Sequence, residues 1–158
     1  MSAASLTSVV NPIRASPRWL PDIYPLLLGL GRDDRSRILL TDREGSWPRP
    51  ISEGPGHDFN PEPSPDGKWV AYLHGPQDDL ERNDLMLAHL ETNRVSRLSR
   101  TVGCGIGLVR WSPEGARLAF TSEQPGFYEV YLIDIADGRQ RQLTHFGHDV
   151  EEFAWSPD

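Results

Sequence analysis

Two short segments of the sequence each place a histidine beside an aspartate. They are Gly56-His57-Asp58 and Gly147-His148-Asp149, which repeat the same three residue types. Imidazole nitrogens and carboxylate oxygens can bind a transition metal or a polar ligand. His57, Asp58, His148 and Asp149 are therefore the candidate ligand-contact residues. The interpretation that we favour is that each triplet hydrogen-bonds within its own part of the fold, because a metal site needs converging ligands. We expect no bound metal.

The other reactive side chains lack the sequence context that catalysis requires. The sequence contains no Gly-x-Ser-x-Gly nucleophile motif and no His-Glu-x-x-His zinc motif. Lys68 is the single lysine, and it does not lie in a phosphate-binding loop. Residues 103–107, Gly-Cys-Gly-Ile-Gly, open no helix, so we interpret them as a connector. Nothing in the sequence marks Cys104 as a reactive thiol. We therefore expect no catalytic residue and no cofactor.

Composition excludes several classes of protein. The chain has 158 residues and a net charge of -7, with 16 basic and 23 acidic residues and no basic run, which disfavours nucleic-acid binding. Its 14 glycines and 14 prolines are too frequent for a helical bundle. The longest aliphatic run, residues 26–30, is too short to cross a bilayer, and residues 1–10 lack the basic start of a secretory signal. We expect a cytoplasmic protein with no membrane partner, or a periplasmic one if the true N-terminus is longer.

A repeat dominates the organisation of the chain. The turn sequence Ser64-Pro65-Asp66-Gly67 recurs as Ser112-Pro113-Glu114-Gly115 and as Ser156-Pro157-Asp158, with a degenerate copy at Leu20-Pro21-Asp22. The copies begin at residues 20, 64, 112 and 156, at intervals of 44, 48 and 44. A second marker, an aliphatic residue followed by Ser or Thr, occurs at Leu6-Thr7, Ile51-Ser52, Leu98-Ser99 and Leu143-Thr144. Two markers in phase establish the repeat.

Each repeat unit is predicted to form short antiparallel strands. The expected strands are 25–30, 37–41 and 49–52 in the first unit, 69–73, 84–90 and 94–98 in the second, and 108–111, 117–121, 129–135 and 139–143 in the third. In the turn motif, proline fixes φ at the second position and glycine accepts a positive φ at the fourth, which predicts a tight hairpin. Residues 128–135 are apolar on both faces, which indicates a sheet covered on both sides.

Four-stranded units that repeat every 44 to 48 residues and stack face to face are typical of a β-propeller. We therefore predict an all-β chain, a partial propeller of about three four-stranded antiparallel blades with the start of a fourth. The expected blades cover about residues 17–52, 58–100 and 106–145, and the fourth starts at 149–158. An all-β sandwich is the alternative, but it does not account for the phased repeat. Trp19, Trp111 and Trp155 share one repeat position, so we predict that they pack between blades.

The third unit carries the closest resemblance to a known family. Residues 111–122, Trp-Ser-Pro-Glu-Gly-Ala-Arg-Leu-Ala-Phe-Thr-Ser, with the later Tyr131-Leu132-Ile133-Asp134 and Arg141-Gln142-Leu143-Thr144, resemble the WD-like repeat of TolB-type propellers. The second unit matches through residues 64–72 and the first weakly, so the resemblance covers most of residues 5–158. Similar repeats occur in the TolB protein, in the tricorn protease and in the N-terminal propeller of prolyl oligopeptidase-family serine peptidases.

The resemblance implies a function that the chain would not perform alone. The first repeat begins near residue 20, so the chain looks most like the propeller of a prolyl oligopeptidase-family peptidase, and it stops inside the fourth turn motif. We expect a fragment that lacks the catalytic α/β-hydrolase domain and that limits which peptides reach the parent enzyme. The alternative is a TolB-like scaffold or protein-binding module with no hydrolase. Expected partners are the missing domain and, through open blade faces, further copies of the chain.

Overall fold

The computed structural model describes residues 28–29, 36–40, 49–52, 54–76, 82–98 and 104–156. These residues form eleven β-strands and no helix, so the described part of the chain contains no helix that could span a membrane. The predicted repeat markers at Leu6-Thr7, Trp19 and Leu20-Pro21-Asp22 lie outside the described residues.

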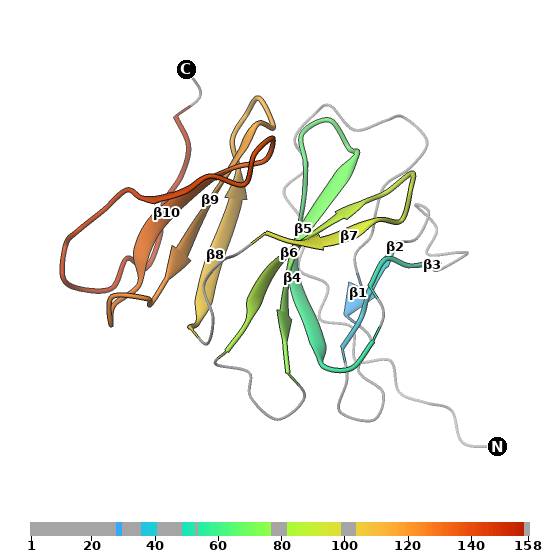
Figure 1. Cartoon of the computed structure of the whole chain (residues 1–158), viewed down its shortest axis with the longest axis horizontal. Coiled ribbons are helices and arrows are strands. Elements are labelled where there is room, and N and C mark those ends of the chain that lie inside the picture. Colours follow the sequence, from blue (N-terminus) through green and yellow to red (C-terminus); the bar gives the residue numbers. More distant parts are fainter. Residues whose placement is uncertain are drawn as a thin grey trace.

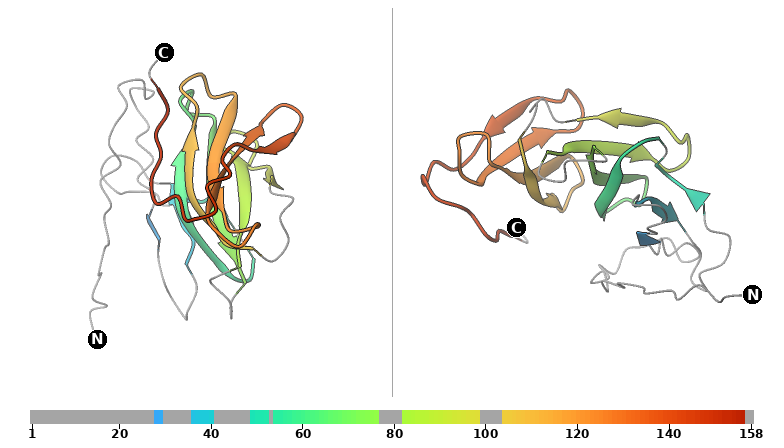
Figure 2. Two further views of the ribbon diagram at one scale, coloured as in Figure 1. Left: turned by 90° about the vertical axis from the view of Figure 1, so that its left-hand side faces the viewer. Right: turned by 90° about the horizontal axis from the view of Figure 1, so that it is seen from below.

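The strands form three antiparallel sheets in which consecutive strands are neighbours. As described, the first sheet contains β1 (Leu28–Gly29), β2 (Ile38–Leu40) and β3 (Arg49–Pro50). The second contains β4 (His57–Pro63), β5 (Trp69–Gly75), β6 (Asp84–His89) and β7 (Val95–Arg97). The third contains β8 (Ile106–Trp111), β9 (Arg117–Ser122), β10 (Glu129–Asp134) and β11 (Gln140–Gln142). The sheets lie side by side along the chain (Figure 1) and follow an arc (Figure 2).

Face-to-face stacking of the sheets buries the core. Alternate residues of a strand point to opposite faces, and on β5 Val70 and Tyr72 pack against the first sheet while Ala71 and Leu73 pack against the third. The same alternation divides β10, whose Tyr131 and Ile133 face the second sheet. Its Val130 and Leu132 lie under Val150, Phe153 and Trp155. The predicted sheet with two apolar faces is therefore confirmed, as is the all-β propeller-blade architecture.

The turn motif adopts the conformation that its residues predict. In the second sheet the amide of Gly67 donates to the carbonyl of Ser64 at 3.0 Å, and Gly67 has a φ of 70°. The Ser64 hydroxyl accepts a hydrogen bond from the amide of Trp69 at 2.9 Å. Ser112 accepts the amide of Arg117 in the same way at 3.0 Å. The serine therefore ties the end of the turn to the start of the next strand.

The second marker closes each sheet at its last strand. The amides of Ile51, Leu98 and Leu143 donate to the carbonyls of Ile38, Leu85 and Val130, respectively. In two sheets the following hydroxyl bonds to the same backbone: Ser52 Oγ accepts the amide of Ile38 at 3.2 Å, and Thr144 Oγ1 accepts the amide of Val130 at 2.9 Å. These bonds align Ile38, Leu85 and Val130 as one repeat position.

The strand β4 differs from the sequence interpretation, which treated His57 and Asp58 as part of a connector. They are the first residues of β4, where they pair with Gly75 and His74 of β5. The segment looks unlike a strand because it contains Asn60, with a φ of 49°, and two prolines. An edge strand tolerates both features, because one side of its backbone needs no partner. The register also shifts between Phe59 and Glu62, which absorbs the irregularity.

The predicted role of the repeated tryptophans is confirmed for the two that are described. The indole Nε1 of Trp111 donates to the carbonyl of Glu62 in the second sheet at 2.9 Å. The indole Nε1 of Trp155 donates to the carbonyl of Arg110 in the third sheet at 3.2 Å. Glu62 and Arg110 precede their turn serines by two residues each. Each tryptophan thus bonds to the same position of the preceding sheet.

Candidate functional site

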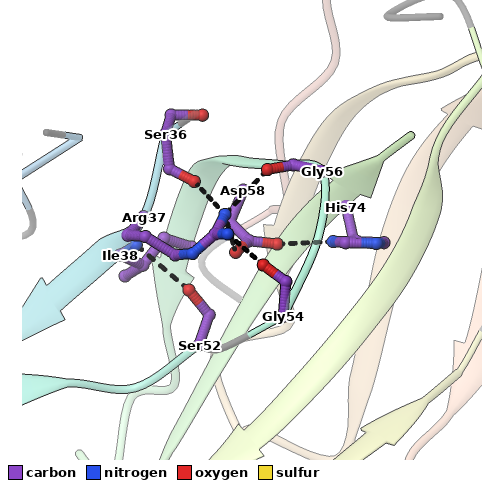
Figure 3. Close-up of polar contacts among 8 residues, drawn as sticks. All are labelled: Ser36, Arg37, Ile38, Ser52, Gly54, Gly56, Asp58 and His74. Carbon is purple, nitrogen blue, oxygen red and sulfur yellow. Dashed lines mark hydrogen bonds and ion pairs between the residues drawn. The ribbon is translucent and has the colours of Figure 1, made fainter. Parts of the chain in front are cut away.

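Asp58 is the centre of a polar cluster between the first and second sheets (Figure 3). Its side chain is 2% exposed. One carboxylate oxygen lies 2.7 Å from Nδ1 of His74, its cross-strand neighbour on β5, and the other lies 3.5 Å from Nη1 of Arg37. A buried carboxylate between two nitrogen groups satisfies the requirement that buried charge be paired.

Arg37 connects the first sheet to the segment that enters the second. Its Nη1 donates to the carbonyls of Ser36 and Gly56 at 2.8 and 2.7 Å, and its Nη2 donates to the carbonyl of Gly54. The amide of Asp58 also donates to the carbonyl of Ser36 at 3.1 Å. The guanidinium therefore holds together three carbonyls and one carboxylate that belong to two neighbouring sheets.

Gly56 is required at its position by backbone geometry. Its φ is 97°, and a Cβ there would clash with the backbone carbonyl oxygen of Gly75 and would lie 2.9 Å from Cε1 of His74. Only glycine combines this conformation with such close approach at no cost. The glycine of the triplet thus allows the end of β5, with His74, to lie against the connector.

Tyr72 lies two residues before His74 on the same face of β5. Burial raises the pKa of its phenol to about 12, the negative charge of Asp58 adds to the rise, and Arg37 opposes it. The phenol therefore stays protonated at any physiological pH. It is a permanent hydrogen-bond donor beside the Asp58 cluster.

The second triplet makes different contacts. Oδ1 of Asp149 accepts the amide of Tyr128 at 2.8 Å, and the ring of His148 stacks on Phe146 with centroids 5.7 Å apart. His148 and Asp149 are both exposed. Their contacts hold the connector against the start of β10 rather than forming a buried cluster.

The two triplets are not in the same register. The amide of Asp58 donates to Ser36, and the amide of Val150 makes the matching bond to Tyr128 at 2.7 Å. Because Ser36 and Tyr128 each lie two residues before an aligned repeat position, Asp58 corresponds to Val150 and His57 corresponds to Asp149. The triplets therefore share residue types without sharing backbone positions.

Arg37 and Glu129 occupy matching positions but carry opposite charges. Glu129 is 2% exposed; it accepts the hydroxyl of Thr144 at 2.5 Å and the amide of Gly147 at 2.8 Å. The hydrogen bond from Thr144, assisted by the backbone amides of the connector, holds the pKa of Glu129 below its usual range despite burial. Like Arg37, this side chain fastens a connector to the sheet before it.

Metal and thiol chemistry gain no support from the described residues. Within them, no three His, Cys, Asp or Glu side chains gather into a group that could hold a metal ion. Cys104 is partly buried. Ligand contact by His57, Asp58, His148 and Asp149 stays a prediction. The sequence interpretation missed Arg37 and His74, whose residue types are not repeated at their position in the other units.

Comparison with known proteins identifies the architecture. No family model matches the chain. A putative TolB from Agrobacterium tumefaciens superposes with a TM-score of 0.64 at 20% identity, covering 80% of this chain and 44% of that one. A puromycin-hydrolyzing peptidase of Mycobacterium tuberculosis superposes with a TM-score of 0.61 at 18% identity, covering 70% of this chain and 18% of that one. The described sheets have the fold of β-propeller blades, as in these two proteins.

Sequence comparison relates this propeller to a larger enzyme. Dipeptidyl-peptidase 5 of Porphyromonas gingivalis is 30% identical over 109 residues, which are 66% of this chain and 16% of that protein. The chain therefore spans about a sixth of the length of this relative. The polar clusters at Arg37 and Glu129 both lie where the chain leaves one sheet, and each fastens the connector that follows to that sheet.

Proposed function

We propose that this chain is the propeller portion of a prolyl oligopeptidase-like serine peptidase, in which it limits the size of peptide that reaches the active site. The observation that carries the proposal is the 30% identity with dipeptidyl-peptidase 5 over 109 residues. In this proposal hydrolysis belongs to another part of the parent protein, since the sequence contains no Gly-x-Ser-x-Gly motif.

The chain offers a physical basis for restricting access. Its sheets are stacked through apolar cores, and the ion pair of Arg37 with the buried Asp58 adds to the contact between the first two, so the described sheets form a rigid surface. Peptides would have to pass along or around this rigid surface. A rigid surface excludes folded and long substrates, because admitting them would deform the packed sheets, and such deformation costs free energy.

Two measurements test the catalytic assignment. The isolated chain should not hydrolyse chromogenic dipeptide amides or esters, and turnover that a serine-directed inhibitor abolishes would contradict the proposal. Reading the gene beyond codon 158 should reveal a Gly-x-Ser-x-Gly motif followed by an aspartate and a histidine. A stop codon after further blades would instead indicate a TolB-like binding module.

The access role is tested in the complete enzyme. Phe120 is fully buried between the second and third sheets, and Phe120→Ala should loosen that junction. We expect the ratio of kcat/KM for a long peptide to that for a dipeptide substrate to rise, with the dipeptide value unchanged. Phe146→Ala, which removes an exposed ring, is the control. An unchanged ratio in a folded Phe120→Ala enzyme would refute the access role.

A further inference from the structure

A groove of about 600 Å³ lies between the first and second sheets. It is lined by Arg49, Pro50, Ile51, Pro55, Tyr72, His74, Met86, Asn93 and Val95. Residues of β3 form one side, and residues of β5, β6 and β7 form the other. The volume lies within the range of small-molecule and peptide side-chain pockets, about 300–1,000 Å³.

The corresponding junction between the second and third sheets contains an additional aromatic ring. Tyr72 pairs with Met86 across β5 and β6, and the aligned pair in the third sheet is Phe120 with Tyr131. The rings of Phe120 and Tyr131 stack with centroids 5.7 Å apart, and Tyr131 is 6% exposed. In the first junction the thioether of Met86 replaces the second ring. The groove therefore lies where a ring packs in the neighbouring junction.

The charge of the groove favours an anionic ligand. Among the described lining residues there is no carboxylate, although the chain as a whole carries a net charge of -7. The exposed guanidinium of Arg49 donates to Oδ1 of Asn93 at 2.6 Å and to the carbonyl of Leu90 at 3.2 Å. Arginine has five N–H donors, so these two bonds fix its position and leave donors for a carboxylate.

We propose that the groove binds the C-terminal residue of a peptide when that residue is aromatic. The ring lies against Met86 and the 43% exposed Val95, and the carboxylate bonds to Arg49. Met86 suits this role because a thioether packs favourably against aromatic edges. The choice of a peptide as ligand rests on the proposed function, whereas the ring and the carboxylate follow from the groove itself.

The two methionines of the sequence give a direct test, since only Met1 and Met86 carry a methyl thioether. N-acetylphenylalanine is titrated into the chain labelled with ¹³C at the methionine methyls. We expect a saturable upfield shift of the Met86 methyl, with about tenfold weaker binding of N-acetylphenylalanine amide and of N-acetylalanine. No shift at millimolar probe, or equal shifts with the three probes, would overturn the proposal.

Variants separate the two halves of the site. Arg49→Gln should reduce the affinity for N-acetylphenylalanine to that for the amide, whereas Arg139→Gln, at an exposed arginine in the turn between β10 and β11, should change nothing. Met86→Tyr introduces the residue found at the aligned position of the third sheet, Tyr131, whose ring should fill the groove. It should abolish binding in a folded chain, which saturation transfer to the aromatic protons of the probe measures. Binding that survives Met86→Tyr would refute the site. No readout involves hydrolysis, so the result is independent of the catalytic assignment.

Discussion

Arg37 and Glu129 carry opposite charges, yet each side chain fastens the connector that follows its sheet. Both side chains lie one residue before an aligned position, Ile38 or Val130, whose amide bonds to a hydroxyl of the closing marker. Arg37 binds carbonyl oxygens and the carboxylate of Asp58, whereas Glu129 binds a hydroxyl and an amide. A connector exposes both carbonyl and amide groups, so either charge can fasten it. The backbone register sets the position of the fastening residue. The charge of its side chain determines whether it bonds to carbonyl groups or to amide groups of the connector.

The two connectors differ in the partners of the fastening charge. Around Arg37 the fastening charge needs a second charge, Asp58, and a third polar group, His74. Around Glu129 the partners are neutral donors. Removing one member should therefore be more damaging in the first connector, because a buried charge would lose its partner.

Asp58→Ala should give the largest effect, a loss of about 3 kcal/mol in the free energy of unfolding. The substitution leaves the Nδ1 of His74 and the guanidinium of Arg37 without their shared carboxylate. Urea denaturation of the two chains measures the loss. Asp149→Ala, which removes one hydrogen bond to an exposed amide, is the matched control and should cost about 1 kcal/mol. Equal losses would remove the distinction between the connectors.

Arg37→Met should cost about 2 kcal/mol, because it removes charge-assisted hydrogen bonds and leaves Asp58 with His74 alone. A double-mutant cycle with Asp58→Ala measures the coupling between the two side chains. We expect the double variant to lose clearly less than the two single losses added together. Additive losses would show that Arg37 fastens the connector through carbonyls only.

Trp111→Phe should cost about 1 kcal/mol by removing the indole bond to the carbonyl of Glu62 while keeping an aromatic ring. Trp155→Phe removes the matching bond to the carbonyl of Arg110. This bond is more exposed, so its loss should reduce the free energy of unfolding by less. Thermal unfolding of both variants compares the two junctions. A larger loss for Trp155→Phe would contradict the view that burial strengthens these bonds.

The smallest effect should be a pH dependence that belongs to Glu129. Hydrogen bonding lowers its pKa from the ordinary value of 4.5, so its ionised form stabilises the fold above that pH. As the pH falls below 4.5 and through the lowered pKa, this contribution is lost. The difference in Tm between the original chain and Glu129→Gln should therefore narrow on acidification, and a constant difference would contradict the assignment.

Much of the fold could be predicted because its signals repeat. The Ser-Pro-Asp-Gly turn and the Ile-Ser or Leu-Thr marker each appear several times, so agreement among copies overrides local ambiguity. β4 was missed because Asn60, Pro61 and Pro63 contradict strand propensity, and only its place at a sheet edge makes them acceptable. Blade limits remain predictions, since parts of the first unit lie outside the described residues.

The sequence by itself determined the β-class, the phase of the blades and the inter-blade place of Trp111 and Trp155, because each depends on local turn chemistry or on periodicity. The tertiary structure alone decided that Asp58 meets Arg37 and His74. These residues are 21 and 16 positions from Asp58, and no repeated spacing links them. It also showed that two identical Gly-His-Asp triplets are displaced by one residue, because backbone hydrogen bonds, not residue types, set the register of one blade on the next.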